Sequence, residues 1–597
     1  MDKPALTQVE LNEDMTTIGV GRYRNKVENA KARGSEAETT YGQRLIRGSL
    51  PAYIKAIAEL KDTWASVKNK GRWQKDILAM PSEKVGFLVM RTVFDQLTSS
   101  TKMTALCVRV GSVIDYQRRS EDLVKSNPKG EGIILGAQRR SGWQATKAHI
   151  RKSMKHEVDK GLMEDIPAWT RRDIVAAGLN LVELLRAVTG VIEYRYITDL
   201  GRRNPSRYVT AAPDTLKWIE EFNHHKEIIT PFWLPSVNTP VEWTGIWDGG
   251  YRLEDSNLPK LPFIKTTNMD FLRSLKGKLE EPMEACNLIQ QTPWKVNEPV
   301  LEVMKWAWEN SVKVGGLPSR EDEILPDVPK DFHEDKKVNL RWRVMASGIH
   351  KRNISTRSRR LLVAKVLFLA EKLVGNRFFY PTHCDFRGRV YNVPSFLGIQ
   401  GPDMCRGLLH FARPQRIKTD TDRRWLAIQG ANTWGYDKVT LDERVQWADD
   451  FAENAIRIAA HPTKELEWID ADDPWQFLAW CFEWATLKTA GKLDTYLPVN
   501  MDATNNGLQI LSMLTRDPDG MTATNVLPTE KPEDIYKVVA EKAEEIMKAD
   551  AATGDAISQA WLDFGIDRKT TKRSVMCYSY GLTSYSNRHY IAEWYDD

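Results

Sequence analysis

The sequence predicts a multidomain α/β protein that is mainly helical. Three observations lead to this fold class. The chain has 597 residues, which is too many for one hydrophobic core, so about two to four domains are expected. Residues 1–265 are mixed, with helical hydrophobic patterns in three separate segments. Near residue 380 the pattern changes, and strand-like segments begin to mix with helical ones.

The composition is that of a folded protein without a membrane span. Hydrophobic residues make up 42% and charged residues 28% of the chain. The best apolar run, residues 361–374, is interrupted by three charged side chains, whereas a membrane helix needs about 18 uninterrupted apolar residues. The N-terminus lacks the basic-then-apolar pattern of a signal peptide. We therefore expect a cytoplasmic protein with no membrane partner.

The six cysteines are scattered, and no two have C-x-x-C spacing. This spacing argues against a zinc ribbon and against a disulfide scaffold. We expect reduced, mostly buried thiols at Cys107, Cys286, Cys384, Cys405, Cys481 and Cys577.

The N-terminal part predicts helices and one hairpin. The helical patterns cover residues 42–68, 83–115 and 171–188. A hairpin is expected over residues 191–210, because β-favouring flanks surround a Gly-Arg-Arg-Asn-Pro turn. Arg202 and Arg203 at its tip are candidates for DNA contact, although such a tip is also common on an ordinary surface hairpin.

The middle of the chain predicts an irregular connection over residues 235–263 and a helical region over 268–313. Residues 316–336, rich in Pro and acids, indicate a linker. The segment 350–365 then opens a helix that runs to about residue 375. It has six cations and no acidic residue, so it can neutralise phosphates, but a solvated helix face fits the same pattern. The cations are Lys351, Arg352, Arg357, Arg359, Arg360 and Lys365.

A buried helix is predicted after Asp473-Pro474. Asp is a favourable N-cap and Pro is favourable at the first helical position. The sequence WQFLAWCFEWATL that follows is apolar nearly all round, which is typical of a helix in a core. Its tryptophans are therefore expected in the core and not on a base-stacking surface.

The first candidate site is Asp502, in residues 496–509. Apolar and polar residues alternate up to position 501, which predicts a strand with Asp502 at its end. A carboxylate at a strand end suits a hard cation such as Mg²⁺. It also suits the capping of a turn, so the carboxylate alone does not distinguish a metal ligand from a turn cap.

The second candidate site is the segment 567–581. Its residues Arg568, Lys572, Met576 and Tyr580 are spaced by four and share one face of a helix. Two cations near the positive N-terminal end of a helix suit the phosphates of a nucleoside triphosphate. The alternative is an exposed basic helix with Met576 and Tyr580 in the core.

Together these sites resemble a known family. An Asp followed downstream by R-x3-K-x7-Y-G resembles motifs A and B of the right-hand polymerases. Residues 385–391, DFRGRVY, resemble the D-x-R-G-R-x-Y signature of the single-subunit phage and mitochondrial RNA polymerases, and residues 400–404, QGPDM, fit the same pattern. Gly507 stands where the related DNA polymerases have a bulky Glu, and Met576 where they have an aromatic residue.

The resemblance implies residue roles. Asp502 binds the metal and is catalytic together with Lys572. The implied substrate-binding residues are Arg568, Arg573, Met576, Tyr580, Gly581 and Gly507. The implied nucleic-acid contacts are Arg387, Arg389 and Tyr391 on template or hybrid, Arg202 and Arg203 on the promoter hairpin, and Arg359 and Arg360 on the thumb.

The resemblance also implies a right-hand polymerase fold. Its expected parts are an N-terminal promoter- and template-binding domain (1–315), a thumb (316–378), part of the palm (379–517) and part of the fingers (518–597). The implied partners are a double-stranded DNA promoter and template, nascent RNA and ribonucleoside triphosphates, with Mg²⁺ as cofactor. The implied location is the cytoplasm of an infected bacterium.

Two departures from the family pattern matter. No His-Asp-Ser motif with a second catalytic aspartate occurs, and Ile510 stands where the family usually has His. Two-metal phosphoryl transfer needs more than one carboxylate. We therefore expect the isolated chain to be inactive, either as a fragment or as one half of a split enzyme whose second polypeptide carries the remaining palm and fingers.

Two rival functions remain. One is a non-catalytic, DNA-binding polymerase remnant. The other is a family A-like DNA polymerase, which Gly507 and the D-x-R-G-R-x-Y segment disfavour.

Overall fold

The computed structural model describes residues 6–126, 167–198, 205–253, 258–492 and 494–596, with a few further positions between 152 and 161 and at 256. Contacts divide the chain into two compact units. The larger unit comprises Met1–Leu11, Trp233–Glu254 and Lys260–Asp597, and the smaller comprises Asn12–Phe232 and Asp255–Pro259. The limits expected at residues 315, 378 and 517 remain predictions about polymerase subdomains.

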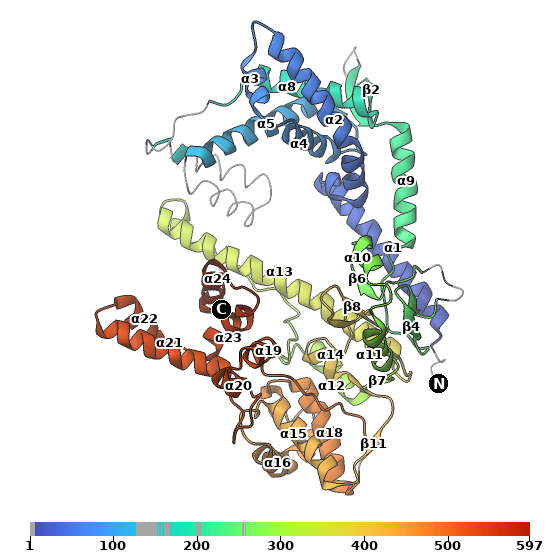
Figure 1. Ribbon diagram of the computed structural model, residues 1–597, viewed down its shortest axis with the longest axis vertical. Coiled ribbons are helices and arrows are strands. Elements are labelled where there is room, and N and C mark those ends of the chain that lie inside the picture. Colours follow the sequence, from blue (N-terminus) through green and yellow to red (C-terminus); the bar gives the residue numbers. More distant parts are fainter. Residues whose placement is uncertain are drawn as a thin grey trace. The chain divides into compact units, whose positions relative to one another are not determined.

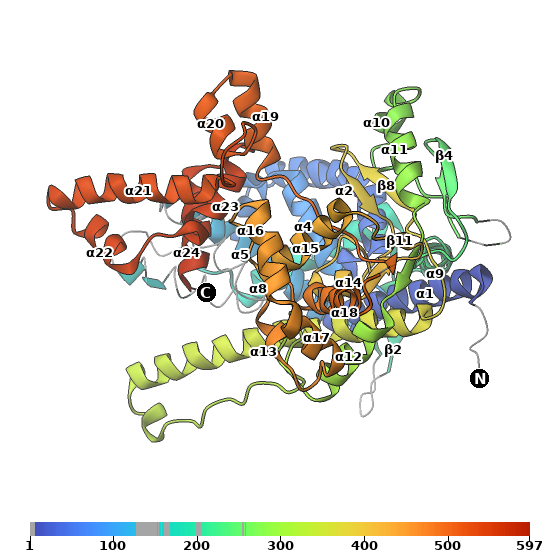
Figure 2. The same cartoon turned by 90° about the horizontal axis from the view of Figure 1, so that it is seen from below.

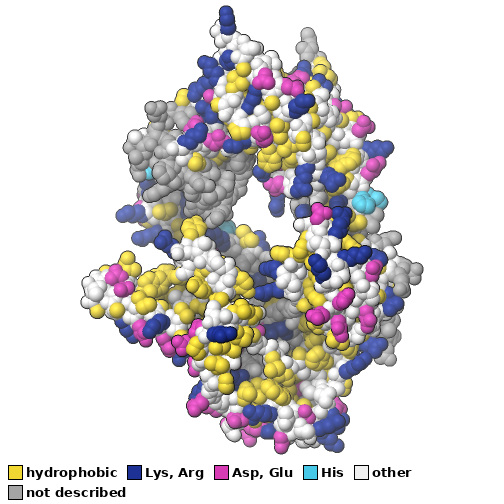
Figure 3. All heavy atoms as spheres, in the orientation of Figure 1, with side chains coloured by type: hydrophobic (Ala, Val, Ile, Leu, Met, Phe, Trp, Pro, Cys, Tyr) yellow, Lys and Arg dark blue, Asp and Glu magenta, His cyan; other side chains and the backbone are white. Residues whose placement is uncertain are grey.

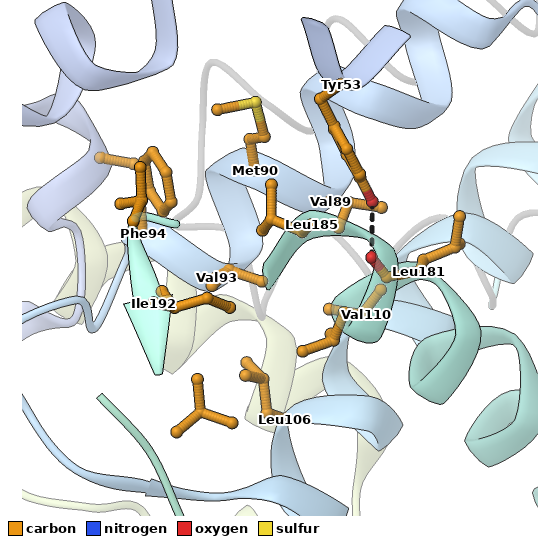
Figure 4. Close-up of a cluster of buried hydrophobic side chains, with 14 of the residues drawn as sticks. Tyr53, Val89, Met90, Val93, Phe94, Leu106, Val110, Leu181, Leu185 and Ile192 are labelled. Carbon is orange, nitrogen blue, oxygen red and sulfur yellow. Dashed lines mark hydrogen bonds between the residues drawn. The ribbon is translucent and has the colours of Figure 1, made fainter. Parts of the chain in front are cut away.

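The smaller unit is a helical body with one small sheet. Its core lies among α2 (Thr40–Ser66), α4 (Ser82–Phe94), α5 (Met103–Ser126) and α8 (Arg171–Thr189), where Val89, Val110 and Leu181 are fully buried. The Tyr53 hydroxyl donates to the Leu181 carbonyl oxygen at 2.7 Å inside this core (Figure 4). The other helices are α3 (Arg72–Ala79), α9 (Pro213–Ile228) and α1 (Gln8–Arg33), which is the first helix of the described chain.

The helices expected over 42–68 and 171–188 are confirmed as α2 and α8. The helical pattern expected over 83–115 is present but divided between two helices, because α4 ends at Phe94 and α5 begins at Met103. The intervening segment is rich in Ser and Thr, whose hydroxyls bond to local backbone and compete with helix formation. The Ser99 hydroxyl, for example, donates to the Gln96 carbonyl oxygen at 3.0 Å.

The predicted hairpin is confirmed. β2 (Ile192–Ile197) pairs antiparallel with β3 (Ser206–Ala211), with Ile192 opposite Ala211 and Ile197 opposite Ser206. The short strand β1 (Thr101–Lys102) adds to the other side of β3. Arg202 and Arg203 lie outside the described residues, so their predicted DNA contact stays a prediction.

The larger unit is mainly helical with several small sheets (Figure 1), which confirms the predicted fold class. β8 (Thr382–Asp385) lies between the parallel β6 (Ile264–Lys265) and the antiparallel β9 (Val390–Asn392). The two-stranded sheets pair β4 (Val241–Gly245) with β5 (Asp248–Gly250), β7 (Trp294–Val296) with β10 (Leu409–Phe411), and β11 (Gln415–Arg416) with β12 (Asp494–Thr495).

Two expectations for the middle of the chain need correction. Residues 235–263 are not wholly irregular, since they contain β4 and β5. The helical region expected over 268–313 is interrupted by β7, because Pro293 disfavours helix in the residue before it and the next three residues pair with β10. The helices on either side are α10 (Met269–Ser274), α11 (Glu280–Gln290) and α12 (Glu298–Glu309).

Helix α13 (Lys336–Leu373) is longer than predicted. It begins near residue 336 and not near 350, because the Asp335 side chain caps it by accepting from the Lys337 backbone N–H at 2.7 Å. The linker expected over 316–336 is confirmed, since its only regular element is the short 3₁₀ turn Lys330–Phe332.

Helix α18 (Pro474–Ala490) is buried, and Trp475, Trp480 and Trp484 are fully inaccessible. Their predicted place in the core is therefore confirmed. Asp473 is the N-cap residue as expected, but its side chain makes no capping bond. The Asp403 carboxylate accepts instead from the backbone N–H groups of Trp475 at 2.9 Å and Gln476 at 3.1 Å.

Packed with α18 are α14 (Asp403–Gly407), α15 (Asp420–Trp434) and α17 (Ala452–Ala460). The Trp484 Nε1 on α18 also donates to the Ala448 carbonyl oxygen on α16 (Leu441–Asp450) at 2.9 Å. The C-terminal helices are α19 (Asn506–Thr515), α20 (Pro518–Ala523), α21 (Ile535–Ala552), α22 (Ala556–Phe564), α23 (Arg568–Tyr578) and α24 (Ser584–Asp596). None of the helices in the described part of the chain is long and apolar enough to cross a membrane.

Candidate active site

A cavity of about 750 Å³ in the larger unit brings the separately predicted motifs together. Three sequence segments that lie far apart contribute to its wall: the loop between β8 and β9, the extended segment before α19, and α23. The predicted site residues that line it are Arg389, Asp502, Arg568, Lys572, Met576 and Tyr580.

Helix α23 presents its predicted face to this cavity. Asp567 caps the helix by accepting from the Thr570 backbone N–H at 2.9 Å. Arg568, Lys572 and Met576 line the cavity, whereas Val575 is buried. Met576 is 46% and Tyr580 69% exposed, so the alternative that places both in the core does not fit. The positive end of the helix faces the same space as the two cations.

Arg568 is held by groups that sequence reasoning missed. Asp534 caps α21, accepting from the Tyr536 backbone N–H at 3.0 Å, and also pairs with the Arg568 Nε. The Arg568 guanidinium lies 5.3 Å from the Tyr536 ring centroid, within cation–π range. Burial raises the pKa of the Asp534 carboxyl, but the hydrogen bond and charge of Arg568 outweigh it and hold that pKa below its usual range. The only sequence signal was an Asp before a helical run.

Asp502 lies exposed at the cavity wall, but not at the end of a sheet strand. The strand predicted over 497–501 is wrong, since within the described residues β12 ends at Thr495 and no strand pairs with this segment. The segment is extended because side chains hold it. The Asn500 backbone N–H donates to the Gln429 side-chain oxygen at 2.8 Å, and the Asn500 Nδ2 donates to the Gln476 Oε1 at 2.7 Å.

This hydrogen bonding continues into the core. The Gln476 Nε2 donates to the Asp403 Oδ1 at 3.1 Å. Burial raises the pKa of the Asp403 carboxyl to about 6, and hydrogen bonds from Trp475 and Gln476 only partly offset it. A chain of side chains therefore runs from the cap of α18 to Asn500, two residues before Asp502.

The described residues supply one ligand for a divalent cation and do not form a complete metal site. Mg²⁺ is usually bound by one or two carboxylates together with water and substrate phosphates. Asp502 offers such a carboxylate, but in the described ranges no three His, Cys, Asp or Glu side chains cluster closely enough to hold a metal. A cation at Asp502 would therefore take its remaining ligands from water, substrate phosphates or a further carboxylate.

The loop between β8 and β9 is shaped by its own aspartate. The Asp385 Oδ1 accepts from the backbone N–H groups of Arg387 at 2.8 Å and Arg389 at 3.0 Å, and Gly388 takes the left-handed conformation with φ of 83°. Arg389 consequently points to the cavity, where its Nη2 donates to the Tyr580 hydroxyl at 3.0 Å. Arg387 pairs instead with Asp385 at 2.8 Å, and Tyr391 lies partly exposed on β9.

The remaining predicted substrate residues have different surroundings. A Cβ at Gly507 would lie 2.9 Å from the Ser579 Oγ, next to Tyr580. Gly581 has φ of 80°, which favours glycine. Arg573 does not line the cavity; it pairs with Glu593 on α24, and its guanidinium lies 4.0 Å from the Tyr590 ring centroid.

Comparison with known proteins agrees with this geometry. Residues 418–597 match the family model described as DNA-dependent RNA polymerase. The chain is 29% identical to T7 RNA polymerase of Escherichia phage T7 over 99% of this chain and 71% of the relative. It is 28% identical to the DNA-directed RNA polymerase of Enterobacteria phage T3, covering 99% of this chain and 70% of that one. Residues 418–597 thus carry a DNA-dependent RNA polymerase domain, and the chain is similar to phage RNA polymerases over nearly its whole length.

The likeness extends to organelle members of the family. The mitochondrial DNA-directed RNA polymerase 1B of Nicotiana tabacum is 27% identical over 92% of this chain and 59% of that one. The predicted resemblance to phage and mitochondrial RNA polymerases is thus confirmed. The matched residues 418–597 include Asp502 and all of α23. They therefore cover the cavity lining apart from Arg389.

The two arginines that the resemblance assigns to a thumb, Arg359 and Arg360, differ in their surroundings. Arg360 on α13 pairs with Asp322 at 2.9 Å and is partly buried. Arg359 is exposed and has no ion pair within the described residues. Neither lines the cavity, so their predicted role concerns nucleic acid elsewhere along α13.

Proposed function

We propose that the cavity binds a ribonucleoside triphosphate for template-directed RNA synthesis. The observation that carries this proposal is the convergence of Arg389, Asp502 and Lys572, from three distant parts of the sequence, on one cavity. The match of residues 418–597 to the DNA-dependent RNA polymerase model and the similarity to phage RNA polymerases support it. DNA template, RNA and nucleoside triphosphates are the substrates that this activity requires.

The reaction is a nucleotidyl transfer. The RNA 3′-hydroxyl oxygen forms a bond to the α-phosphorus, the bond from that phosphorus to the β-phosphate oxygen breaks, and pyrophosphate leaves with the electron pair while the hydroxyl proton goes to solvent or base. Bound Mg²⁺ would neutralise phosphate charge, with Asp502 as one ligand. Arg568 and Lys572 stabilise negative charge on the departing phosphates, and the N-terminal end of α23 adds to this.

Ribose selection falls to Tyr580 and Gly507 in this proposal. Tyr580 stands at the cavity with its hydroxyl held by Arg389. Gly507 has no side chain to exclude a 2′-hydroxyl, and its backbone lies close to the residue before Tyr580. Arg573, which faces α24, would reach phosphate only if its pair with Glu593 opened.

Nucleic-acid contacts are proposed for Arg387, Arg389 and Tyr391 on the template or hybrid, and for Arg359 and Arg360 on the thumb. All five are cations or aromatic residues that reach the surface or the cavity. Cations of this kind contact phosphate, and aromatic rings stack on bases. Arg202 and Arg203 are proposed to contact promoter DNA from the hairpin tip.

A second polypeptide, carrying the remaining palm and fingers, is proposed to pack on α19. Ile510, Met513 and Leu514 on this helix are 54%, 48% and 77% exposed. Figure 3 shows hydrophobic side chains gathered over the part of the surface that carries the C-terminal helices α19 to α24. Such an apolar patch is typical of an interface. The setting proposed for the assembled enzyme is the cytoplasm of an infected bacterium.

The direct test is binding of a nonhydrolysable α,β-methylene ribonucleoside triphosphate, measured by calorimetry with a primed template present. Arg568→Ala and Lys572→Ala should each weaken binding about tenfold or more, because a charge-assisted hydrogen bond to phosphate is lost. Lys569→Ala is the matched control, since Lys569 lies on the same helix, is exposed and does not line the cavity. Equal losses of affinity in all three variants would show that the triphosphate does not bind in this cavity.

The rival function, a DNA-binding remnant, predicts a different result. A remnant binds template but gains no affinity for the triphosphate when template and primer are paired. Primer extension by the chain, alone or together with a polypeptide that covers α19, would rule it out.

A further inference from the structure

The acidic linker before α13 lies against the basic part of that helix. Figure 2 shows the linker running back along α13. The Asn353 Nδ2 donates to the Glu323 carbonyl oxygen at 2.9 Å, and the Glu323 backbone N–H donates to the Asn353 Oδ1 at 2.8 Å. Asn353 is buried, so this pair of hydrogen bonds fixes the position of the linker against α13.

Two carboxylates of the linker occupy three arginines of the helix. Glu323 forms a two-pronged pair with Arg352, with Nε to Oε1 at 2.9 Å and Nη2 to Oε2 at 2.8 Å. Asp322 pairs with Arg357 and, at 2.9 Å, with Arg360. The hydrogen bond from Arg357 lowers the pKa of Asp322, and that from Arg352 lowers the pKa of Glu323. Both carboxylates are therefore charged at neutral pH.

These contacts have the geometry that a nucleic acid would use. A carboxylate accepts from the forked N–H groups of arginine in the same way as a phosphate does. We propose that Asp322 and Glu323 act as an internal phosphate mimic, which nucleic acid must displace from α13 before its own phosphates bind there. This inference rests on the proposed function, in which α13 contacts template or hybrid.

The rest of the basic segment is not covered in this way. Lys351 and Arg359 are exposed and have no ion pair among the described residues. They are available for first contact, whereas Arg352, Arg357 and Arg360 become available only on exchange. Exchange is easiest at the Arg352–Glu323 pair, because both of its side chains are exposed and exposed ion pairs in water are individually weak. The device would favour long, multiply charged ligands, which replace both carboxylates at once, over short ones.

The test is the salt dependence of binding to an RNA–DNA hybrid duplex, followed by fluorescence anisotropy with the full chain. In the Asp322→Asn, Glu323→Gln double variant, the slope of log K against log salt should steepen by about 0.9 for each freed arginine that meets a phosphate. Affinity near 50 mM salt should rise about tenfold or more. Glu323→Gln alone frees only Arg352 and keeps the backbone bonds to Asn353, so it should give a smaller gain of the same sign.

Glu321→Gln is the matched control. Glu321 lies in the same linker, is exposed and has no ion pair within the described part of the chain, so its substitution changes net charge without freeing an arginine. A gain in Glu321→Gln equal to that in Glu323→Gln would overturn the proposal, because general charge would then explain the effect.

Two further outcomes also count against it. Arg352→Gln and Arg357→Gln could weaken hybrid binding while the Asp322→Asn, Glu323→Gln variant gains no affinity. Phosphates would then already reach these arginines, and the carboxylates would not act as a phosphate mimic. If no variant binds the hybrid, α13 is not a nucleic-acid surface and the inference fails. The triphosphate-binding test at the cavity uses other residues, so it judges the proposed function separately.

Discussion

The Arg389 Nη2 donates a hydrogen bond to the Tyr580 hydroxyl over 3.0 Å. The two residues are 191 positions apart in the sequence, and each belongs to a different motif. The bond ties the loop between β8 and β9 to the residue that follows α23. The orientation of Tyr580 at the cavity is therefore set by the loop as well as by its own helix.

A double-mutant cycle measures this connection. Arg389→Ala and Tyr580→Phe should each reduce the preference for ribo- over deoxyribonucleoside triphosphate, and the double variant should lose no more than either one. The coupling expected for such a hydrogen-bonded pair is about 0.5–3 kcal/mol. Binding of both triphosphate types by calorimetry gives the ratio. Additive effects would mean that the two residues act separately.

Tyr578→Phe serves as the control for that cycle. Tyr578 is 68% exposed, also ends α23 and does not line the cavity. Loss of its hydroxyl should leave the ribose preference unchanged and show no coupling to Arg389.

Asp534 has two separable roles, as the cap of α21 and as the partner of Arg568. Asp534→Ser keeps a capping oxygen and loses the ion pair, whereas Asp534→Ala loses both, so Ala should cost about 1 kcal/mol more stability than Ser. Chemical denaturation at neutral pH compares the two variants. Equal stability would show that the cap contributes nothing.

The same residue gives a pH dependence. Its pKa is lowered in the folded protein, so its ion pair contributes stability above the ordinary Asp range, and this contribution is lost as pH falls below about 4. The stability gap between wild type and Asp534→Ser should accordingly narrow on acidification. A gap that widens as pH falls would contradict the assigned ion pair.

Asp403 should give folding stability a pH dependence of the opposite sign. Its pKa in the folded protein is about 6 against an ordinary value of 3.8, so the folded state binds more protons between these values. Stability contributed at this position therefore falls as pH rises from about 4 to about 6. Asp403→Asn cannot titrate and should remove up to about 3 kcal/mol of this pH dependence. Urea titrations at several pH values across that window measure it.

Gly507→Glu tests the ribose pocket. The new side chain would meet Ser579 beside Tyr580, where a Cβ already comes within 2.9 Å of the Ser579 Oγ. Ribonucleoside triphosphate binding should fall about tenfold or more, a loss typical of a few unfavourable contacts in a pocket, with a smaller loss for the deoxy form. Gly507→Ala is the control, because rotation of the Ser579 hydroxyl can relieve its single contact. Unchanged ribose preference in Gly507→Glu would place the 2′-hydroxyl elsewhere.

Local pattern predicted much of this molecule. The period of four along α23 put Arg568, Lys572 and Met576 on one face, and helix geometry alone makes that inference valid. The same holds for the burial of α18, whose apolar residues surround the helix.

The sequence pattern could not identify hydrogen-bond and ion-pair partners that lie far away in the sequence. Alternation around Asp502 predicted a strand, but an extended backbone follows equally from side-chain donors and acceptors on α15 and α18. The cap of α18 comes from Asp403, 72 residues away from Trp475. The cations of α13 looked unopposed because the carboxylates that pair with them precede the helix in the linker. Each of these depends on how the chain folds back.

The hydrogen-bonded path from Asp403 through Gln476 to Asn500 has a consequence for genetics. The position of Asp502 therefore depends on Gln429 and Gln476, which are buried and do not line the cavity. A screen for loss of transcription should therefore recover alleles at Gln476 and Gln429 whose protein is soluble and binds template normally. Such alleles would look like defects of chemistry although they lie beneath the reacting surface.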